Sequence, residues 1–302
     1  MDVQTIAVIG AGTMGRGIAY AAAFGGYKTV LEDISLRVLE QATAWIRQSF
    51  EEGVSRGKVE ASVRDKALSL VSTSTDIKDA IRNAELIIEA VPEELAMKLE
   101  LFTILDKFAK TGAIFASNTS SLSMTEFTGA IGSRDRCIGM HFFNPVPKMK
   151  LIELVRTPQT TEETVATCRE VARRIGKEVV LVNEAPGFVT TRINALIGNE
   201  AFNMLEAGIA TAEDIDKALK LGLNHPMGPF ELVDLVGLDV RLNILEYLHS
   251  TLGEKYRPNK LLRQYVKEGR LGRKTGHGVY DYAQQKASNH EGSEKKATEK
   301  NG

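Results

Sequence analysis

One stretch near the N-terminus decides the fold of this chain: Thr5-Ile6-Ala7-Val8-Ile9-Gly10-Ala11-Gly12-Thr13-Met14-Gly15. Its first five residues are apolar or β-branched, which is typical of a short buried strand. Glycines then interrupt the run, an apolar helical segment follows at 18–24, and a second β-rich run covers 27–31. This order predicts a strand–turn–helix–strand unit from a parallel sheet.

The glycine-rich turn has the G-x-G-x-x-G form, which binds a dinucleotide when it leaves a strand and opens a helix. We expect Gly10 to permit the tight turn and Gly12 to let a pyrophosphate approach the backbone. Gly15 is expected to let the helix pack closely on the strand, and the helix N-terminus favours the diphosphate anion. The predicted cofactor-binding turn is completed by the residues between these glycines, Ala11, Thr13 and Met14.

Asp33 stands at the end of the second predicted strand, 18 residues beyond Gly15 (33 − 15). An acidic residue at about this spacing accepts hydrogen bonds from the adenosine ribose hydroxyls. A carboxylate there also repels a 2′-phosphate, so NAD is predicted as the cofactor rather than NADP. Arg37, one helical turn further on, tempers this preference slightly.

Two domains are predicted from the change in pattern along the chain. Short apolar strands and helices alternate up to about residue 185, and only helices are predicted after Pro186-Gly187, including a helical stretch over 230–252. The predicted fold class is α/β, with a Rossmann-like, doubly wound, mostly parallel sheet in residues 1–185 and an all-α domain in residues 186–283. Residues 284–302 contain no Val, Ile, Leu, Met or aromatic residue, so a disordered tail is predicted there.

The bulk properties exclude several functions. The 302 residues carry 38 Lys+Arg and 39 Asp+Glu, a net charge of −1, so no global basic field attracts nucleic acid or anionic lipid. Cys137 and Cys168 match no zinc or redox spacing, and no metal site is predicted. No signal peptide or membrane-length apolar segment is found. We therefore expect a cytosolic protein with no membrane or nucleic-acid partner.

The segment His141-Phe142-Phe143-Asn144-Pro145-Val146-Pro147 carries the strongest catalytic signal, together with Glu153 in the following apolar run. A carboxylate that accepts a hydrogen bond from one imidazole nitrogen fixes the tautomer, and the other nitrogen becomes a base suited to neutral pH. A buried histidine with a purely structural partner is the alternative. The dinucleotide signature at the start of the chain favours the catalytic interpretation.

With both features in view, the chain resembles the 3-hydroxyacyl-CoA dehydrogenases, especially the short bacterial 3-hydroxybutyryl-CoA dehydrogenases. The resemblance spans roughly residues 3–282. It rests on six motifs in order: Val8 to Gly15, Ser117-Asn118-Thr119-Ser120-Ser121, His141 to Pro147, Pro186-Gly187-Phe188-Val189, Pro226-Met227-Gly228-Pro229-Phe230-Glu231-Leu232 and Lys274-Thr275-Gly276.

The resemblance implies a reaction and a set of site residues. His141 would exchange a proton with the substrate 3-hydroxyl, Glu153 would hold the imidazole, and NAD would accept the hydride. Ser120 and Asn144 match polar family residues near the reacting oxygen and the nicotinamide, and the resemblance also implies that Ser120 would contact the CoA substrate. Further family positions at the cofactor are matched by Glu93, Lys98 and Lys274, and those at the CoA moiety by Ser49 and Arg56.

One departure from the family pattern and two alternatives remain. The family commonly has Phe-x-x-Asn-Arg after Pro-Gly, where this chain has Thr191, with Asn194 three residues further on. The alternatives to an acyl-CoA dehydrogenase are a β-hydroxyacid dehydrogenase acting on a free acid and a non-catalytic protein that binds NAD(H). The family also implies a homodimer formed through the helical domain.

Overall fold

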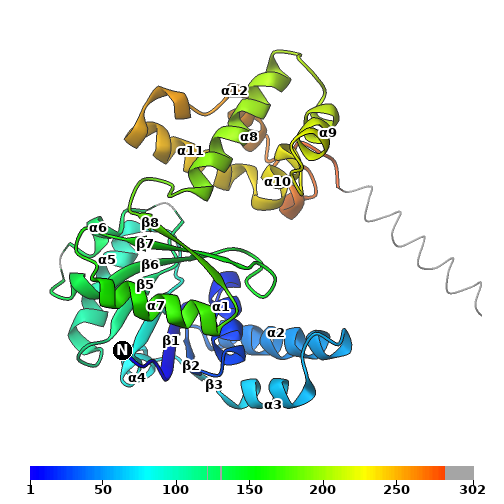
Figure 1. Cartoon of the computed structure of the whole chain (residues 1–302). Helices are drawn as coiled ribbons and strands as arrows, with labels where there is room; N and C mark the ends of the chain where they lie inside the picture. Colours follow the sequence, from blue (N-terminus) through cyan, green and yellow to red (C-terminus); the bar gives the residue numbers. More distant parts are fainter. Residues whose placement is uncertain (121, 130, 283–302) are drawn as a thin grey trace, which may run out of the picture. The chain divides into compact units, whose positions relative to one another are not determined.

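The computed structural model describes residues 1–120, 122–129 and 131–282 (Figure 1). Two compact units are present, Met1–Phe188 and a second that begins at Val189. The predicted tail at 284–302 lies outside the described residues.

The first unit is built on an eight-stranded sheet with the strand order β3-β2-β1-β4-β5-β6-β7-β8. All pairs are parallel except β6 with β7, which is antiparallel. The strands are β1 (Thr5–Ile9), β2 (Lys28–Glu32), β3 (Val71–Ser74), β4 (Leu86–Glu89), β5 (Ile114–Ser117), β6 (Cys137–Phe142), β7 (Leu151–Arg156) and β8 (Glu178–Asn183). The predicted doubly wound, mostly parallel sheet is confirmed.

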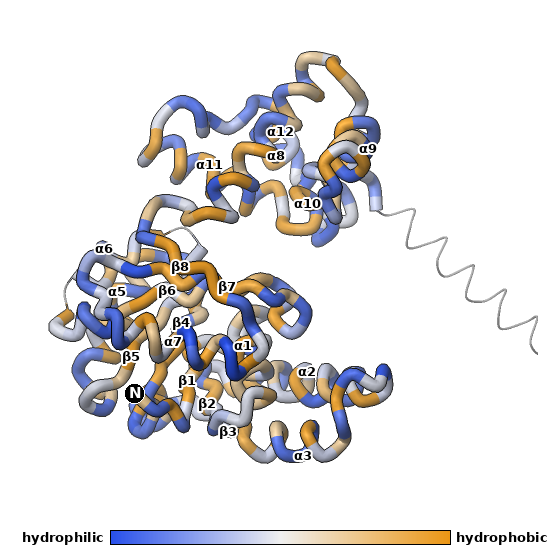
Figure 2. The backbone as a smooth tube through the Cα atoms, in the orientation of Figure 1, coloured by the Kyte–Doolittle hydropathy of each residue, from blue (hydrophilic) through white to orange (hydrophobic). Residues whose placement is uncertain are grey.

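Helices cover both faces of this sheet because each face presents apolar side chains. The helices of the first unit are α1 (Thr13–Phe24), α2 (Leu36–Ser55), α3 (Ala61–Ser69), α4 (Ile77–Ile81), α5 (Leu95–Phe108), α6 (Met124–Phe127) and α7 (Glu162–Arg174). One core cluster contains residues of α1, α2 and α7, and a second contains residues of α4, α5 and α6. Both lie against the apolar strands coloured orange in Figure 2.

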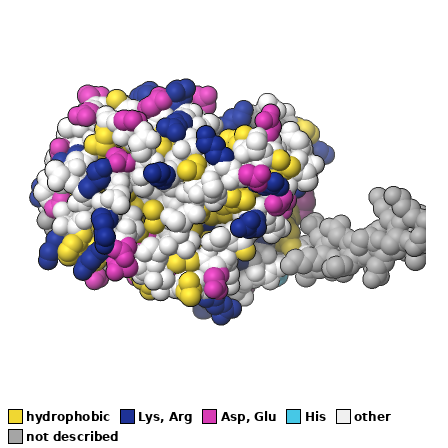
Figure 3. All heavy atoms as spheres, turned by 90° about the horizontal axis from the view of Figure 1, so that it is seen from below, with side chains coloured by type: hydrophobic (Ala, Val, Ile, Leu, Met, Phe, Trp, Pro, Cys, Tyr) yellow, Lys and Arg dark blue, Asp and Glu magenta, His cyan; other side chains and the backbone are white. Residues whose placement is uncertain are grey.

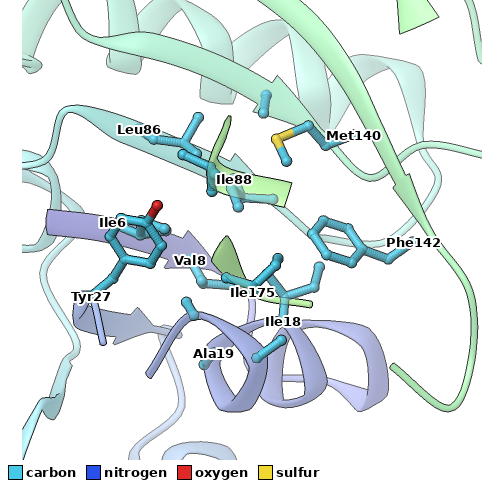
Figure 4. Packing of buried hydrophobic residues seen from close by; sticks show 14 of the residues in the cluster. Ile6, Val8, Ile18, Ala19, Tyr27, Leu86, Ile88, Met140, Phe142 and Ile175 are labelled. Carbon is cyan, nitrogen blue, oxygen red and sulfur yellow. The ribbon is translucent and has the colours of Figure 1, made fainter. Parts of the chain in front are cut away.

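The core beneath α1 fixes where the glycine turn lies. Ile6 and Val8 of β1 are fully buried and pack towards Ile18 and Ala19 of α1 (Figure 4). Burying a side chain of this size contributes roughly 1.5–3 kcal/mol. The turn between β1 and α1 is therefore anchored on both sides.

The second unit is helical, as predicted, with α8 (Thr190–Glu206), α9 (Ala212–Gly222), α10 (Pro229–Val236), α11 (Leu238–Leu252) and α12 (Lys260–Lys267) around its own core. Thr211 caps α9 by accepting a hydrogen bond from the Asp214 amide at 3.2 Å. The helical stretch predicted over 230–252 is divided into α10 and α11. Gly237, with φ of +110°, breaks it in a conformation that other residues rarely adopt.

On the face shown in Figure 3, basic and acidic side chains are interspersed. In the parts of the chain that the structure describes, no helix combines the length and the apolar character needed to cross a bilayer.

Candidate active site

The register of β6 and β7 brings His141 and Glu153 together. The two residues are direct partners in the antiparallel pair, and His141 Nδ1 lies 2.8 Å from Glu153 Oε2. The exposed fractions of the residues are 7% and 1%, so their hydrogen bond is shielded from water. When the carboxylate accepts a hydrogen bond from the protonated Nδ1, Nε2 of the neutral ring is the basic nitrogen. The predicted proximity of these two residues is confirmed.

Aromatic rings line the imidazole of His141. The ring centroid of Phe143 lies 4.6 Å away and that of Phe188 lies 5.8 Å away. Phe188 adopts a left-handed backbone conformation with φ of +49°, directly after Gly187. A left-handed conformation is uncommon for a bulky residue and occurs often at functional sites. Apolar walls around an imidazole limit the access of water to the reacting atoms.

The glycine turn between β1 and α1 has the geometry of a pyrophosphate cradle. Gly10 has φ of +94° and its amide donates to the carbonyl of Glu32 at 2.8 Å. A Cβ at Gly15 would lie 1.7 Å from the Gly10 oxygen, whereas a Cβ at Gly12 would have no heavy atom within 4 Å. The space at Gly12 is open, and no side chain caps the N-terminus of α1. The first amides of α1 can therefore donate to an anion.

Asp33 lies directly beside this turn. Its carboxylate accepts hydrogen bonds from the amides of Ala11 and Ser35, both at 3.0 Å. A carboxylate has about four acceptor positions, so positions remain for ribose hydroxyls. The other residues of the turn differ in exposure: Ala11 is buried, Met14 is half-buried and packs against the core, and Thr13 is exposed.

Glu32 precedes Asp33 and is only 4% exposed. Burial, followed by the charges of Asp33 and Asp76, raises the pKa of Glu32 from 4.5 to about 7. Because the folded state then binds this proton more tightly than the unfolded chain, the contribution of Glu32 to stability is present below about pH 4.5 and is lost as the pH rises to about 7.

Replacing Glu32 by glutamine is therefore expected to change the pH dependence of stability. Above pH 7 the free energy of unfolding of the Glu32→Gln apoprotein should exceed that of the wild type by about 2 kcal/mol, and the difference should vanish below about pH 4.5. Urea unfolding at a series of pH values measures this difference. A gap that stays constant from pH 5 to 8 would contradict it.

Lys98 lies in a buried cluster of charges that the sequence did not reveal. Its Nζ is 2.7 and 2.8 Å from the two carboxylate oxygens of Glu89 and 3.2 Å from Glu93 Oε2. Burial raises the pKa of Glu89, against the lowering effects of Lys98 and Ser117. Burial also acts to raise the pKa of Glu93, but Lys98 and hydrogen bonds from Thr119 lower it overall. Lys98 is 1% exposed, so its predicted contact with the cofactor stays a prediction.

The same cluster positions Ser120. Glu93 Oε1 accepts hydrogen bonds from Thr119 Oγ1 at 2.6 Å and from the Ser120 amide at 3.0 Å. Ser117 Oγ donates to Glu89 Oε2. A serine before a helix can also serve as its N-cap. The cap of α6 is Ser123 instead, so Ser120 is free of that structural role.

Replacing Lys98 by methionine should destabilise the protein strongly, because two carboxylates would lose their shared cation. Removing one partner of a buried ion pair costs about 3 kcal/mol or more. Lys107→Met, an exposed position on the same helix, is the control and should stay within about 0.5 kcal/mol of the wild type. Urea unfolding compares the two. Equal stabilities of both variants would refute a structural role for this ion cluster.

Two further residues that sequence reasoning missed hold the strand ends together. Asn118 Oδ1 accepts the Phe142 amide at 2.9 Å and so links the ends of β5 and β6. Lys177 Nζ donates to the carbonyls of Val146 and Met149 at 2.5 and 2.6 Å. These bonds hold the loop that carries Asn144, an exposed residue directly after β6 and Phe143.

The remaining predicted residues lie on other elements. Ser49 and Arg56 belong to the second half of α2 and its C-cap, where Arg56 is exposed and lies 3.4 Å from Glu52. Lys274 belongs to the second unit, where its Nζ pairs with both carboxylate oxygens of Asp239 at 2.6 Å. Thr191 and Asn194 both lie on α8. The described residues contain no cluster of side chains that could hold a metal ion.

Two family models match the chain. The NAD-binding domain of 3-hydroxyacyl-CoA dehydrogenase matches residues 5–185, and the C-terminal domain of the same enzyme matches residues 187–282. The chain belongs to the 3-hydroxyacyl-CoA dehydrogenase family. Its resemblance to this family, inferred from the six motifs, is confirmed, and NAD is the cofactor.

Individual relatives of this dehydrogenase are similar over nearly their whole length. A 3-hydroxybutyryl-CoA dehydrogenase of Clostridioides difficile is 42% identical over 92% of this chain and 99% of its own. The mitochondrial hydroxyacyl-coenzyme A dehydrogenase of Homo sapiens is 41% identical over 93% of this chain and 91% of its own. The crystal structure of (S)-3-hydroxybutyryl-CoA dehydrogenase from Ralstonia eutropha has a TM-score of 0.90 and 40% identity, covering 93% of this chain and 100% of that one.

The residues of this dehydrogenase fit NAD at the glycine turn. The open space at Gly12 and the uncapped start of α1 suit the pyrophosphate. Asp33 lies beside the turn, where its carboxylate could accept hydrogen bonds from ribose hydroxyls. When bound, NAD supplies the acceptor for a hydride from the substrate carbon that bears the hydroxyl.

Proposed function

We propose that this dehydrogenase interconverts (S)-3-hydroxyacyl-CoA and 3-oxoacyl-CoA thioesters with short acyl chains, such as 3-hydroxybutyryl-CoA and acetoacetyl-CoA. The observation that carries the proposal is the buried hydrogen bond of 2.8 Å between His141 and Glu153. The names of the relatives support the substrate class.

In the oxidative direction, His141 acts as the base. Its Nε2 takes the proton from the 3-hydroxyl, and the negative charge of Glu153 stabilises the imidazolium that forms. In the reductive direction, the protonated ring returns the proton to the same oxygen. A base of this kind contributes about 10²–10⁴-fold to the rate.

Other polar residues are proposed to bind the substrate and cofactor. Ser120 and Asn144 would donate hydrogen bonds near the reacting oxygen and the nicotinamide, where they favour alkoxide character. Glu93, Lys98 and Lys274 are proposed on the cofactor side. Ser49 and Arg56 are proposed to contact the CoA moiety, whose phosphates attract a guanidinium.

We also propose that residues 1–185 bind the cofactor. Residues 186–283 are proposed to bind the substrate and to form the homodimer. Exposed apolar side chains support the dimer: Leu235 of α10 is 50% exposed, and Val236 and Val240, on either side of Gly237, are each 39% exposed. Sedimentation of the wild type and of Leu235→Glu tests this, and a wild-type monomer at micromolar concentration would refute it.

A cytosolic location is proposed from the free cysteines Cys137 and Cys168.

The loss of NADH absorbance with acetoacetyl-CoA tests the proposed reaction. Acetoacetyl-CoA should consume NADH, and free acetoacetate at the same concentration should not. Equal turnover of the free acid would favour a β-hydroxyacid dehydrogenase. NADH that binds but is never consumed would favour a non-catalytic NAD(H)-binding protein.

A further inference from the structure

Glu32 lies directly beneath the edge of the dinucleotide turn. It is the last residue of β2, paired with Ile9 of β1 and with Ser74 of β3. Its carbonyl accepts the Gly10 amide at 2.8 Å, which fixes the backbone of Glu32 against the first glycine. The next residue in the chain is Asp33, the residue proposed to read the ribose.

Glu32 is largely buried, and its carboxyl group has no counter-ion among the described residues. The residue is 4% exposed, and its carboxyl has no hydrogen bond or ion pair with any residue that the structure describes. Among the described residues, the buried side-chain nitrogen and oxygen atoms without a hydrogen-bond partner are Arg16 Nε and Arg241 Nε. The Glu32 oxygens have no partner and are not among these buried atoms, so they keep contact with solvent. The charges that act on this group are those of Asp33 and Asp76, and both are negative.

The neighbouring start of α2 has the opposite character and would attract a phosphate. This helix of 20 residues has no acidic residue in its first turn, and its N-terminal amides favour anions. Arg37 lies in that turn, is exposed, and forms no ion pair within the described parts of the chain. A phosphate on the 2′-oxygen of a ribose held by Asp33 would therefore meet favourable as well as unfavourable charges.

Asp33 alone is a weak barrier against that phosphate. Its two carboxylate oxygens already accept hydrogen bonds from Ala11 and Ser35, which offset part of its negative charge. The charge of Glu32 acts on Asp33, and because little of the residue is exposed, solvent screens this charge less than it screens a charge at the open surface.

We propose that Glu32 is a second acidic determinant of cofactor choice, whose negative charge adds to that of Asp33 and excludes the 2′-phosphate of NADP(H) despite Arg37. Glu32 does not contact the NAD ribose in this account and acts through its charge. The inference rests on the proposed function in one respect, namely that Asp33 binds the adenosine ribose.

Fluorescence titration of the acyl-CoA-free protein with NADH and with NADPH tests the proposal at pH 8 and constant ionic strength. In Glu32→Gln, the ratio of the NADPH to the NADH dissociation constant should fall about tenfold, while the NADH constant stays within about twofold. The double variant Glu32→Gln/Arg37→Ala should restore most of the wild-type ratio, because the cation that binds the phosphate is removed.

The pH dependence gives a second readout. Because the pKa of Glu32 is about 7, the wild-type ratio should rise between pH 6 and pH 8. The 2′-phosphate also titrates at about pH 6. In Glu32→Gln only the phosphate titrates, so the ratio of the NADPH to the NADH dissociation constant should rise less with pH in this variant than in the wild type. An unchanged ratio in Glu32→Gln at pH 8 would overturn the proposal, as would an equal weakening of both cofactors. Since the readout is binding without acyl-CoA, a failure of the proposed reaction would leave it interpretable.

Discussion

Replacing His141 by alanine is expected to lower kcat for acetoacetyl-CoA reduction by about 10³-fold, because the proton donor to the 3-oxygen is lost. The dissociation constant of NADH should change less than twofold, since His141 lies on β6 and is hydrogen-bonded to Glu153 rather than to the glycine turn. Steady-state kinetics and fluorescence titration measure the two quantities separately.

The companion variant Glu153→Gln distinguishes proton transfer by His141 from the stabilisation of its imidazolium by Glu153. The amide keeps the shape of the side chain but not the charge that stabilises the imidazolium, so kcat should fall less than in His141→Ala, by roughly 10²-fold. If His141→Ala kept the wild-type kcat, the histidine would have no part in the proton transfer. If only Glu153→Gln lowered kcat, the assignment of the base would be wrong.

Replacing Gly12 by alanine is expected to weaken NADH binding by about 10³-fold, or about 4 kcal/mol. The protein itself has room for the methyl group, because no heavy atom lies within 4 Å of the added Cβ. The free energy of unfolding of the apoprotein should therefore stay within about 1 kcal/mol of the wild type. The methyl group would fill the space into which the pyrophosphate fits.

Gly15→Ala provides the contrast to Gly12→Ala. Its added Cβ would lie 1.7 Å from the Gly10 oxygen, so the turn must open and the apoprotein should lose stability as well as NADH affinity. Gly12→Ala with unchanged NADH affinity would show that the pyrophosphate does not bind at this turn.

The contact between His141 and Glu153 could be predicted because local rules determine it. His141 ends one apolar segment and Glu153 lies inside the next, so the two residues are close in the chain, and the antiparallel register of β6 and β7 then places them opposite each other. The glycine turn could be predicted for the same reason, since strand, turn and helix follow one another directly in the chain.

Features that depend on packing between distant segments could not be predicted. Glu89 is the last residue of the otherwise apolar and fully buried β4, which signals a buried carboxylate that needs a cation. Its partner Lys98 is identified only once α5 packs over the strand ends. Strand β3 was missed because Val71-Ser72-Thr73-Ser74 is a short, largely polar strand at the sheet edge, where exposure removes the apolar signal.

The reaction of His141 with a thioester substrate is tested most directly by a single-turnover experiment. Protein saturated with NADH is mixed with acetoacetyl-CoA, and NADH absorbance is followed for the wild type and for His141→Ala at equal NADH occupancy. We predict rapid loss of one equivalent of NADH in the wild type, with (S)-3-hydroxybutyryl-CoA as the product, and a loss about 10³-fold slower in the variant. Equal rates in both proteins, or no NADH consumption by the wild type, would contradict this account.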